Sequence, residues 1–174
     1  IYTVSPVYFY WLKSSGINGI DDFAGHTIGA PAGDVAVALW PVLAARAGID
    51  PDKVKFANVT PPAKLSSLKS GAVDIIPYLY DAHDLVIDEF GDEVQFIGND
   101  AYNIKPYGIT VFANGGYLEK NRVAVQSFVQ ISQKAFDVCT HDFDPCIAAL
   151  EKATSGLNEA YERKSWERMK TLMN

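Results

Sequence analysis

Two tyrosines and an aspartate, Tyr78, Tyr80 and Asp81, follow an apolar segment that ends at Ile76. Tyrosine rings can stack on a flat molecule, and a carboxylate can orient a hydrogen-bond donor of that molecule. These residue types therefore indicate recognition of a small polar or heteroaromatic ligand. The alternative is that one tyrosine packs into the core, and the alternation of side chains along a strand favours that role for at least one of them.

A second candidate binding segment is the loop at residues 31–34, between a short apolar strand and a helix. Backbone N–H groups of Ala32, Gly33 and Asp34 stand at a helix start, where they can donate to ligand oxygens. The alternative is that Asp34 only caps its own helix. A carboxylate here occupies the anion site of the helix end, which disfavours a directly bound sulfonate or nitrate and favours a neutral or cationic ligand.

The sequence has no recognised setting for a nucleophile, a cofactor or a metal ion. It contains no G-x-S-x-G, H-E-x-x-H, P-loop or G-x-G-x-x-G pattern. His26, His83 and His141 lack the spacing of metal ligands, and His83 among aspartates is typical of the polar face of a helix. We therefore expect no metal, no cofactor and no catalysis.

The elements that must position these residues alternate between strands and helices. Short apolar segments predict strands at 26–30, 54–59, 73–76 and 94–97, with helices after the first three of them. This alternation predicts an α/β fold with a small, mostly parallel sheet. Further along, the sequence predicts a strand at 107–113 and then helices at 122–139, from 144 onward, and at 158–172.

The composition bounds the class of protein. Hydrophobic residues make up 48% of the 174, which is enough for a core. The net charge of −6 and the scattered lysines and arginines disfavour a nucleic-acid partner. No apolar run approaches the roughly 20 residues of a membrane span. The chain begins without Met and without a basic signal region, so we expect a processed or excised piece.

Several short motifs occur in the order seen in one family. They are Ser15-Gly-Ile17, Asp21-Asp-Phe-Ala-Gly25, Thr27-Ile-Gly-Ala-Pro-Ala-Gly-Asp34, Ala47-Gly-Ile-Asp50, Leu68-Lys-Ser-Gly71, Val73-Asp74, and Tyr107-Gly108 followed by Tyr117-Leu-Glu119. With these motifs the chain resembles periplasmic substrate-binding proteins of ABC importers, in the branch that takes up taurine, sulfonates, nitrate and pyrimidine precursors of thiamine. The match covers nearly the whole chain.

The resemblance implies two α/β lobes joined by two crossing strands, with the ligand between the lobes. It implies that residues 1–15 form the first crossing segment and that residues 16–103 form one α/β lobe. Residues 104–174 would hold the second crossing strand and helices of the other lobe. Proteins of this family are longer, so we expect one complete lobe of the periplasmic-binding-protein-like fold plus part of the second.

The resemblance also implies a function and a location. The protein would capture a small molecule, close about a hinge, and deliver the molecule to the membrane subunits of an ABC importer from a periplasmic or otherwise exported position. Tyr8, near the first crossing, would have the same stacking role as Tyr78 and Tyr80. Asn103 and Tyr107, at the second crossing, would line the hinge side of the cleft. For Tyr8 the alternative is a core role, which is commoner for an aromatic stripe.

The two cysteines, Cys139 and Cys146, allow three interpretations. A zinc site is poorly supported because their spacing matches no common zinc pattern, and a redox pair would need C-x-x-C. A short disulfide between two helices is expected if the protein is exported, as the resemblance implies.

Two other functions stay open. Fungal synthases of the thiamine pyrimidine precursor resemble the same family, although they carry a cysteine-rich motif that this chain does not contain. The chain is also compatible with a ligand-sensing domain of a larger receptor. If the molecule ends where this sequence ends, an exposed lobe interface leads us to expect self-association.

Overall fold

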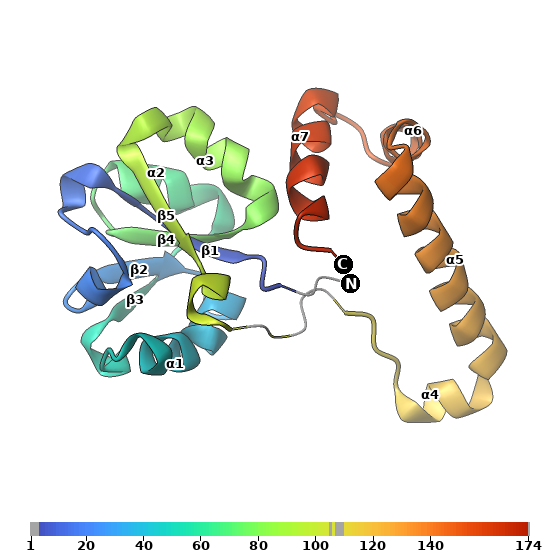
Figure 1. The fold of residues 1–174 in the computed structure, drawn as a ribbon, viewed down its shortest axis with the longest axis horizontal. Coiled ribbons are helices and arrows are strands. Elements are labelled where there is room, and N and C mark those ends of the chain that lie inside the picture. Colours follow the sequence, from blue (N-terminus) through green and yellow to red (C-terminus); the bar gives the residue numbers. More distant parts are fainter. Residues whose placement is uncertain (1–3, 105, 107–109, 174) are drawn as a thin grey trace.

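The computed structural model describes residues 4–104, 106 and 110–173, and a five-stranded sheet forms its centre (Figure 1). The strands are β1 (Val7–Leu12), β2 (Thr27–Ala30), β3 (Lys55–Asn58), β4 (Ile75–Leu79) and β5 (Val94–Gly98), in the order β3-β2-β4-β1-β5. β2 pairs in parallel with β3 and β4, whereas β1 pairs antiparallel with β4 and β5. Four strands therefore share one direction, which confirms the predicted α/β lobe with a mostly parallel sheet.

Helices cover both faces of this sheet. α1 (Val35–Ala47) packs on one face, and α2 (Lys64–Lys69) and α3 (His83–Phe90) pack on the other (Figure 1). Phe9 belongs to the core cluster that contains α1 residues, and Tyr10 belongs to the cluster that contains Leu68 and Val86. Alternation along β1 explains this division, because successive side chains point to opposite faces.

Short 3-10 turns connect many of these elements. They are η1 (Lys13–Ser15), η2 (Ile20–Phe23), η3 (Pro51–Lys53), η4 (Pro61–Ala63), η5 (Tyr80–Ala82), η6 (Gly91–Glu93) and η7 (Asn99–Tyr102). η5 directly follows the carboxyl end of β4, and η7 directly follows that of the parallel-running strand β5, at the same end of the sheet. They therefore determine which side chains stand at that edge of the sheet.

Local sequence signals determine both ends of α1. Asp34 accepts a hydrogen bond from the Ala36 N–H at 2.9 Å and so caps the first turn. Gly48 ends the helix in the left-handed conformation with φ 73°, which glycine adopts without a steric cost. α1 therefore begins at Val35 directly after its cap and ends before Gly48, with Pro41 inside it.

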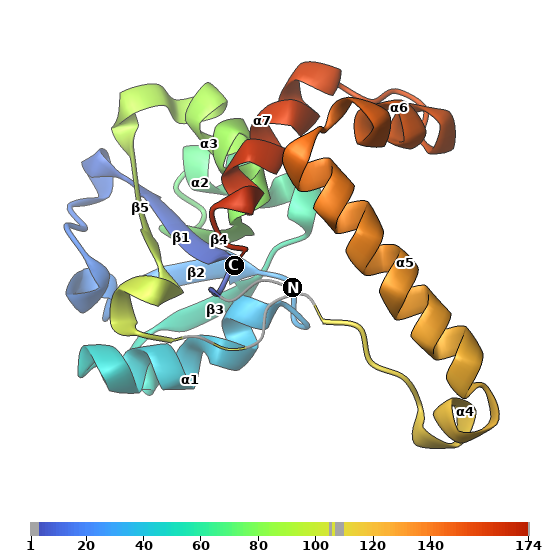
Figure 2. The ribbon, with the colours of Figure 1, turned by 45° about the vertical axis from the view of Figure 1, so that its right-hand side comes forward.

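Residues 115–170 are mainly helical and lie beside the lobe (Figure 1). α4 (Gly115–Lys120), α5 (Arg122–His141) and α6 (Asp144–Ala153) form an arm, and α7 (Glu159–Lys170) lies between this arm and the lobe in both views (Figures 1 and 2). α7 contacts η5 and α3. Trp166 of α7 stacks on Phe143 and Phe136, and so joins α7 to the arm.

Two observations bear on the expected second part of the chain. Residues 110–113 form no strand, and Val111 and Phe112 are 69% and 93% exposed, so the predicted strand is wrong over those residues because no neighbouring strand covers them. Its first residues, 107–109, lie outside the described residues. α7 contacts η5 and α3 of this lobe. The assignment of residues 104–174 to the second crossing and the other lobe stays a prediction.

No helix within the described ranges is long and apolar enough to span a membrane.

Candidate functional site

The sheet topology brings three candidate segments to one edge. Because β1 runs opposite to its neighbours, its first residues lie beside the last residues of β4 and β5. Tyr8 is paired with Tyr78 of β4 and with Gly98 of β5. We call this the candidate edge, and define it as Tyr8 together with residues 31–34, 78–81 and 98–103. In α/β sheets, ligands bind outside the carboxyl ends of the strands.

Tyr8 and Tyr80 stack on each other at the candidate edge. Their ring centroids are 4.3 Å apart and their planes differ by 16°. Gly98 makes room for Tyr8, because a Cβ added to Gly98 would stand only 2.7 Å from the Tyr8 ring. Burial and nearby Asp100 raise the pKa of the Tyr8 hydroxyl to about 12. Each ring thus covers one face of the other.

A lysine that the sequence did not single out connects two predicted site residues. Lys64 is 4% exposed, and its Nζ donates to Asp34 Oδ2 at 2.9 Å and to the Pro77 carbonyl at 2.7 Å. The same Nζ lies 4.9 Å from the Tyr78 ring centroid. The Tyr78 hydroxyl donates to the Pro61 carbonyl at 3.2 Å. No sequence pattern distinguished this lysine from one on a solvated helix face.

Lys64 changes the electrostatic argument for Asp34. We inferred from the sequence that the Asp34 carboxylate disfavours an anion at the start of α1. The structure shows that Asp34 caps the helix and also forms an ion pair with Lys64, whose side chain is buried. The paired ammonium offsets the carboxylate charge. The exposed N–H groups of Ala32 and Gly33 therefore do not face an uncompensated negative charge.

Asp81 differs from Asp34 because it has no ion-pair partner within the described part of the chain. Its side chain is partly buried, and burial raises the pKa of its carboxyl, opposed in part by backbone N–H groups of η5. The Tyr161 hydroxyl of α7 donates to the Asp81 carbonyl at 3.1 Å. A partly desolvated carboxylate of this kind favours a ligand group that donates a hydrogen bond.

His83 is buried, so our interpretation of it as part of a polar helix face is wrong. It is 5% exposed, and its Nδ1 lies 3.2 Å from the Tyr10 hydroxyl. Burial, reinforced by Arg168, lowers the pKa of the imidazole. A neutral imidazole nitrogen can accept the Tyr10 proton. The pair satisfies two polar groups that the aromatic cluster behind the candidate edge would otherwise bury without partners.

The turn η7 forms the side of the candidate edge that follows β5. Asn103 is exposed, has φ 55°, and donates its backbone N–H within this turn. Asn99 is fully buried, donates through Nδ2 to Ser5 Oγ at 3.3 Å, and has no partner for Oδ1 in the described residues. Tyr107, which we also predicted on the hinge side, lies outside the described residues. Asn99 was missed because a buried amide carries no sequence signal.

The structure contains a disulfide between Cys139 at the end of α5 and Cys146 in α6. It lies in the arm and not at the candidate edge. Within the described ranges, no group of three or more histidine, cysteine, aspartate or glutamate residues is arranged to hold a metal ion.

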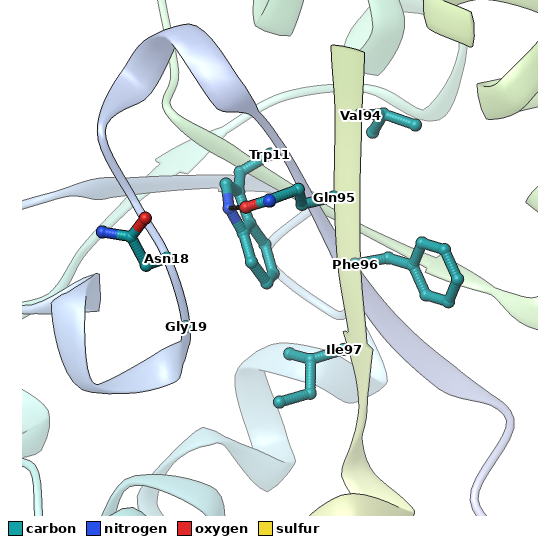
Figure 3. Close-up of a pocket in the computed structure, with 7 residues that line it drawn as sticks. All are labelled: Trp11, Asn18, Gly19, Val94, Gln95, Phe96 and Ile97. Carbon is teal, nitrogen blue, oxygen red and sulfur yellow. Dashed lines mark hydrogen bonds between the residues drawn. The ribbon is translucent and has the colours of Figure 1, made fainter. Parts of the chain in front are cut away.

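A separate pocket of about 360 Å³ lies beside the edge strand β5 (Figure 3). The Trp11 and Gln95 side chains meet there, and Phe96 points to the other side of the strand. The Trp11 indole N–H is already shared between the Ile17 carbonyl at 2.7 Å and Gln95 Oε1 at 3.0 Å. The residues we predicted to bind a ligand do not line this pocket. The candidate edge therefore stays our predicted site.

The fold and the arrangement of this edge define a periplasmic-binding-protein-like lobe. The chain belongs to the NMT1/THI5-like family, whose model matches residues 1–144. No curated protein sequence matches the chain.

Solved structures support the same fold assignment. The periplasmic aliphatic sulphonate binding protein SsuA from Escherichia coli superposes with a TM-score of 0.77 at 19% identity, over 94% of this chain and 52% of that one. The alkanesulfonate-binding protein SsuA from Xanthomonas axonopodis pv. citri, bound to MOPS, gives 0.70 at 15% identity, over 96% and 57%. A putative periplasmic sulfonate-binding SsuA from Methylobacillus flagellatus KT gives 0.66 at 20%, over 96% and 50%. The present chain therefore spans about half the length of these proteins.

Proposed function

We propose that this chain is the ligand-binding lobe of a solute-binding protein that captures a small polar or heteroaromatic molecule and presents it to the membrane subunits of an ABC importer. One observation carries the proposal: Tyr8, Tyr78, Tyr80 and Asp81 meet at the carboxyl edge of the sheet. The fold shared with sulfonate-binding proteins supports it. Capture would proceed by closure of two lobes, without covalent chemistry.

Asp81 and the loop at 31–34 suggest which ligand groups fit. Asp81 favours a hydrogen-bond donor or a cation, because it is partly buried and has no ion-pair partner in the described residues. The exposed N–H groups of Ala32 and Gly33 suit an acceptor or an anion, since Lys64 offsets Asp34. A molecule that carries both kinds of group, such as taurine or MOPS, is therefore favoured over nitrate, which has no donor.

The disulfide supports an exported location. Disulfides persist in oxidising compartments such as the periplasm, and thiol-reducing systems keep them rare in the cytosol. A bonded Cys139–Cys146 pair therefore fits a protein that works outside the cytoplasm, next to an importer.

Native mass spectrometry followed by calorimetry tests the proposal. The purified chain is examined for a retained molecule and then titrated with taurine, MOPS, nitrate and a thiamine pyrimidine precursor. We expect at least one of them to bind, to be recovered unchanged in mass, and to bind several-fold more weakly to Asp81→Asn. Asp92→Asn, an exposed carboxylate in η6, is the matched control and should leave affinity unchanged.

Two results would contradict the proposal. Recovery of a chemically altered molecule would favour the synthase-like enzyme instead. Binding that responds equally to Asp81→Asn and Asp92→Asn would remove the candidate edge as the site.

A further inference from the structure

A continuous column of side chains runs from the sheet to helix α7. Tyr8 lies against the backbone of Gly98, and Tyr80 stacks on Tyr8. On Tyr80, the Arg168 Cζ lies 5.6 Å from the ring centroid. Arg168 is bonded in turn to Asp84 at the start of α3. The column thus joins the candidate edge to a residue far along the sequence.

The guanidinium of Arg168 is fixed in one plane. Its Nε donates to Asp84 Oδ2 and its Nη2 donates to Asp84 Oδ1, both at 2.7 Å. Two parallel charge-assisted bonds restrict the guanidinium more than one bond does. Asp84 is 8% exposed, so Arg168 cannot turn away without leaving a buried carboxylate unpaired. The Asp84 ion pair therefore holds the guanidinium in place beside Tyr80.

We propose that Arg168 is a positioning residue of the candidate site, which holds Tyr80 against Tyr8 and so fixes the tyrosine rim and the adjoining Asp81 that meet the ligand. Its effect on affinity rests on the proposed function. The positioning itself is a property of the unliganded protein, and it can be measured without a ligand.

Docking of α7 has support that does not involve Arg168. Tyr161 donates to the Asp81 carbonyl, and Ser165 and Met169 are buried along the same helix. Loss of the planar guanidinium should therefore loosen Tyr80 without detaching α7. This separates ring positioning from a purely structural role.

The variant Arg168→Lys distinguishes positioning of the Tyr80 ring from docking of α7. A lysine ammonium can still pair with Asp84 as a point charge, but it cannot form two parallel bonds or lie flat on a ring. A pocket of about 440 Å³, lined by Asp84, Arg163, Lys164, Glu167 and Arg168, opens beside the ion pair. Water in this pocket can hydrate the ammonium, so the substitution does not bury an unpaired charge.

Limited nitration with tetranitromethane, mapped by peptide mass spectrometry, measures the accessibility of each tyrosine. In Arg168→Lys we expect nitration of Tyr80 to rise about two- to five-fold, the equivalent of one lost cation–π contact, while Tyr161 stays unchanged. Arg163→Lys is the matched control. It changes an arginine of the same helix that pairs with Glu159 and Asp144 and not with Asp84, and it should leave Tyr80 nitration unchanged.

Asp84→Asn provides a second test, should Arg168→Lys fail to fold. It removes the charge that fixes the guanidinium, and it should raise Tyr80 nitration in the same way. Unchanged Tyr80 nitration in the folded variants would overturn the proposal. An equal rise at Tyr80 and Tyr161 would also overturn it, because Arg168 would then only dock α7.

Calorimetry with MOPS as the probe extends the test to affinity. We expect Arg168→Lys to weaken MOPS binding several-fold, and to have no further effect in a Tyr80→Leu background, since the arginine acts through that ring. An equal loss in both backgrounds would contradict the proposed route through Tyr80. If the wild-type chain binds neither MOPS nor another probe, the proposed function fails, and the nitration result still decides the role of Arg168.

Discussion

The sheet lobe and the arm formed by α4, α5 and α6 contain similar apolar patterns, but only the lobe buries them. Along β1, Val7, Phe9 and Trp11 are no more than 2% exposed. Along α5, Phe128 and Ile131 are 55% and 67% exposed, and no α5 residue is buried. A periodic pattern thus identifies the type of element and the side it would bury. It does not show whether a partner covers that side, and the expected self-association stays a prediction.

Truncation of one aromatic residue in each region gives the largest contrast. Phe9→Ala removes a side chain that is 1% exposed, and we expect it to lower the free energy of unfolding by about 3–5 kcal/mol. Phe128→Ala removes an exposed ring of α5 and should change the free energy of unfolding by about 0.5 kcal/mol or less. Urea unfolding measures both. Equal losses would show that the α5 surface is covered in solution.

The disulfide should stabilise the arm selectively. Cys139 and Cys146 are separated by seven positions, and closing a loop of this size removes about 2–3 kcal/mol of unfolded-chain entropy in the usual model. We expect the double change Cys139→Ser and Cys146→Ser to speed amide exchange in α5 and α6. Amides of β1 and β4 should exchange as in the wild type. Faster exchange throughout the sheet would mean that the two regions unfold as one unit.

Glycine substitutions sharpen the comparison at the level of single contacts. Gly98→Ala places a Cβ against the Asp100 carboxylate and 2.7 Å from the Tyr8 ring, and we expect a loss of about 1–3 kcal/mol with displacement of both side chains. Gly115→Ala in α4 meets no atom within 4 Å, and should stabilise that helix by up to about 1 kcal/mol. Thermal melts measure both effects, and the melting temperature should fall in Gly98→Ala and rise in Gly115→Ala. Stabilisation by Gly98→Ala would show that Tyr8 does not lie against β5.

The sequence predicted the sheet well because strand and helix signals in the lobe are local. Apolar segments bounded by glycine and proline locate β2 to β5. Because these strands run parallel, their carboxyl ends lie at the same end of the sheet. Tyr78, Tyr80 and Asp81 therefore lie at the carboxyl end of β4, as predicted, and their role in binding stays a prediction. The strand expected to end at residue 113 was wrong over 110–113, since its local pattern carried no information about a neighbouring strand.

The ion pairs of Lys64 and Arg168 could not be predicted, because their partners lie far away in the sequence. Lys64 pairs with Asp34 across 30 positions and Arg168 pairs with Asp84 across 84 positions. Such pairs are determined by how helices dock on the sheet, and each residue alone has the appearance of a solvated surface charge. The stacking of Tyr8 on Tyr80 is equally non-local. Sequence patterns thus located the groups that could meet a ligand, but not the groups that hold them in place.

The smallest expected effect is on pH dependence, and it separates the two carboxylates Asp81 and Asp84. The Arg168 hydrogen bonds lower the pKa of Asp84 below the ordinary value of 3.8, whereas burial raises the pKa of Asp81 above it. The Asp84 ion pair therefore stabilises the fold at higher pH, and this stability is lost as the pH falls through the lowered pKa. Protonated Asp81 stabilises the fold at low pH, and that contribution is lost as the pH rises through the raised pKa.

Urea unfolding between pH 3 and pH 7 tests both signs at once, because each Asn variant removes one titration. Asp81→Asn should flatten the stability change in the window just above the ordinary aspartate pKa, and Asp84→Asn should flatten the change below it. In the first window, protonation of Asp81 should also weaken binding of a ligand that donates to it. If Asp81→Asn leaves the profile and the pH dependence of binding unchanged, Asp81 lies in solvent and the donor-bearing ligand must be sought elsewhere on the lobe. The two variants thus show whether the pH dependence of stability comes from Asp81 at the candidate edge, from the Asp84–Arg168 ion pair, or from both.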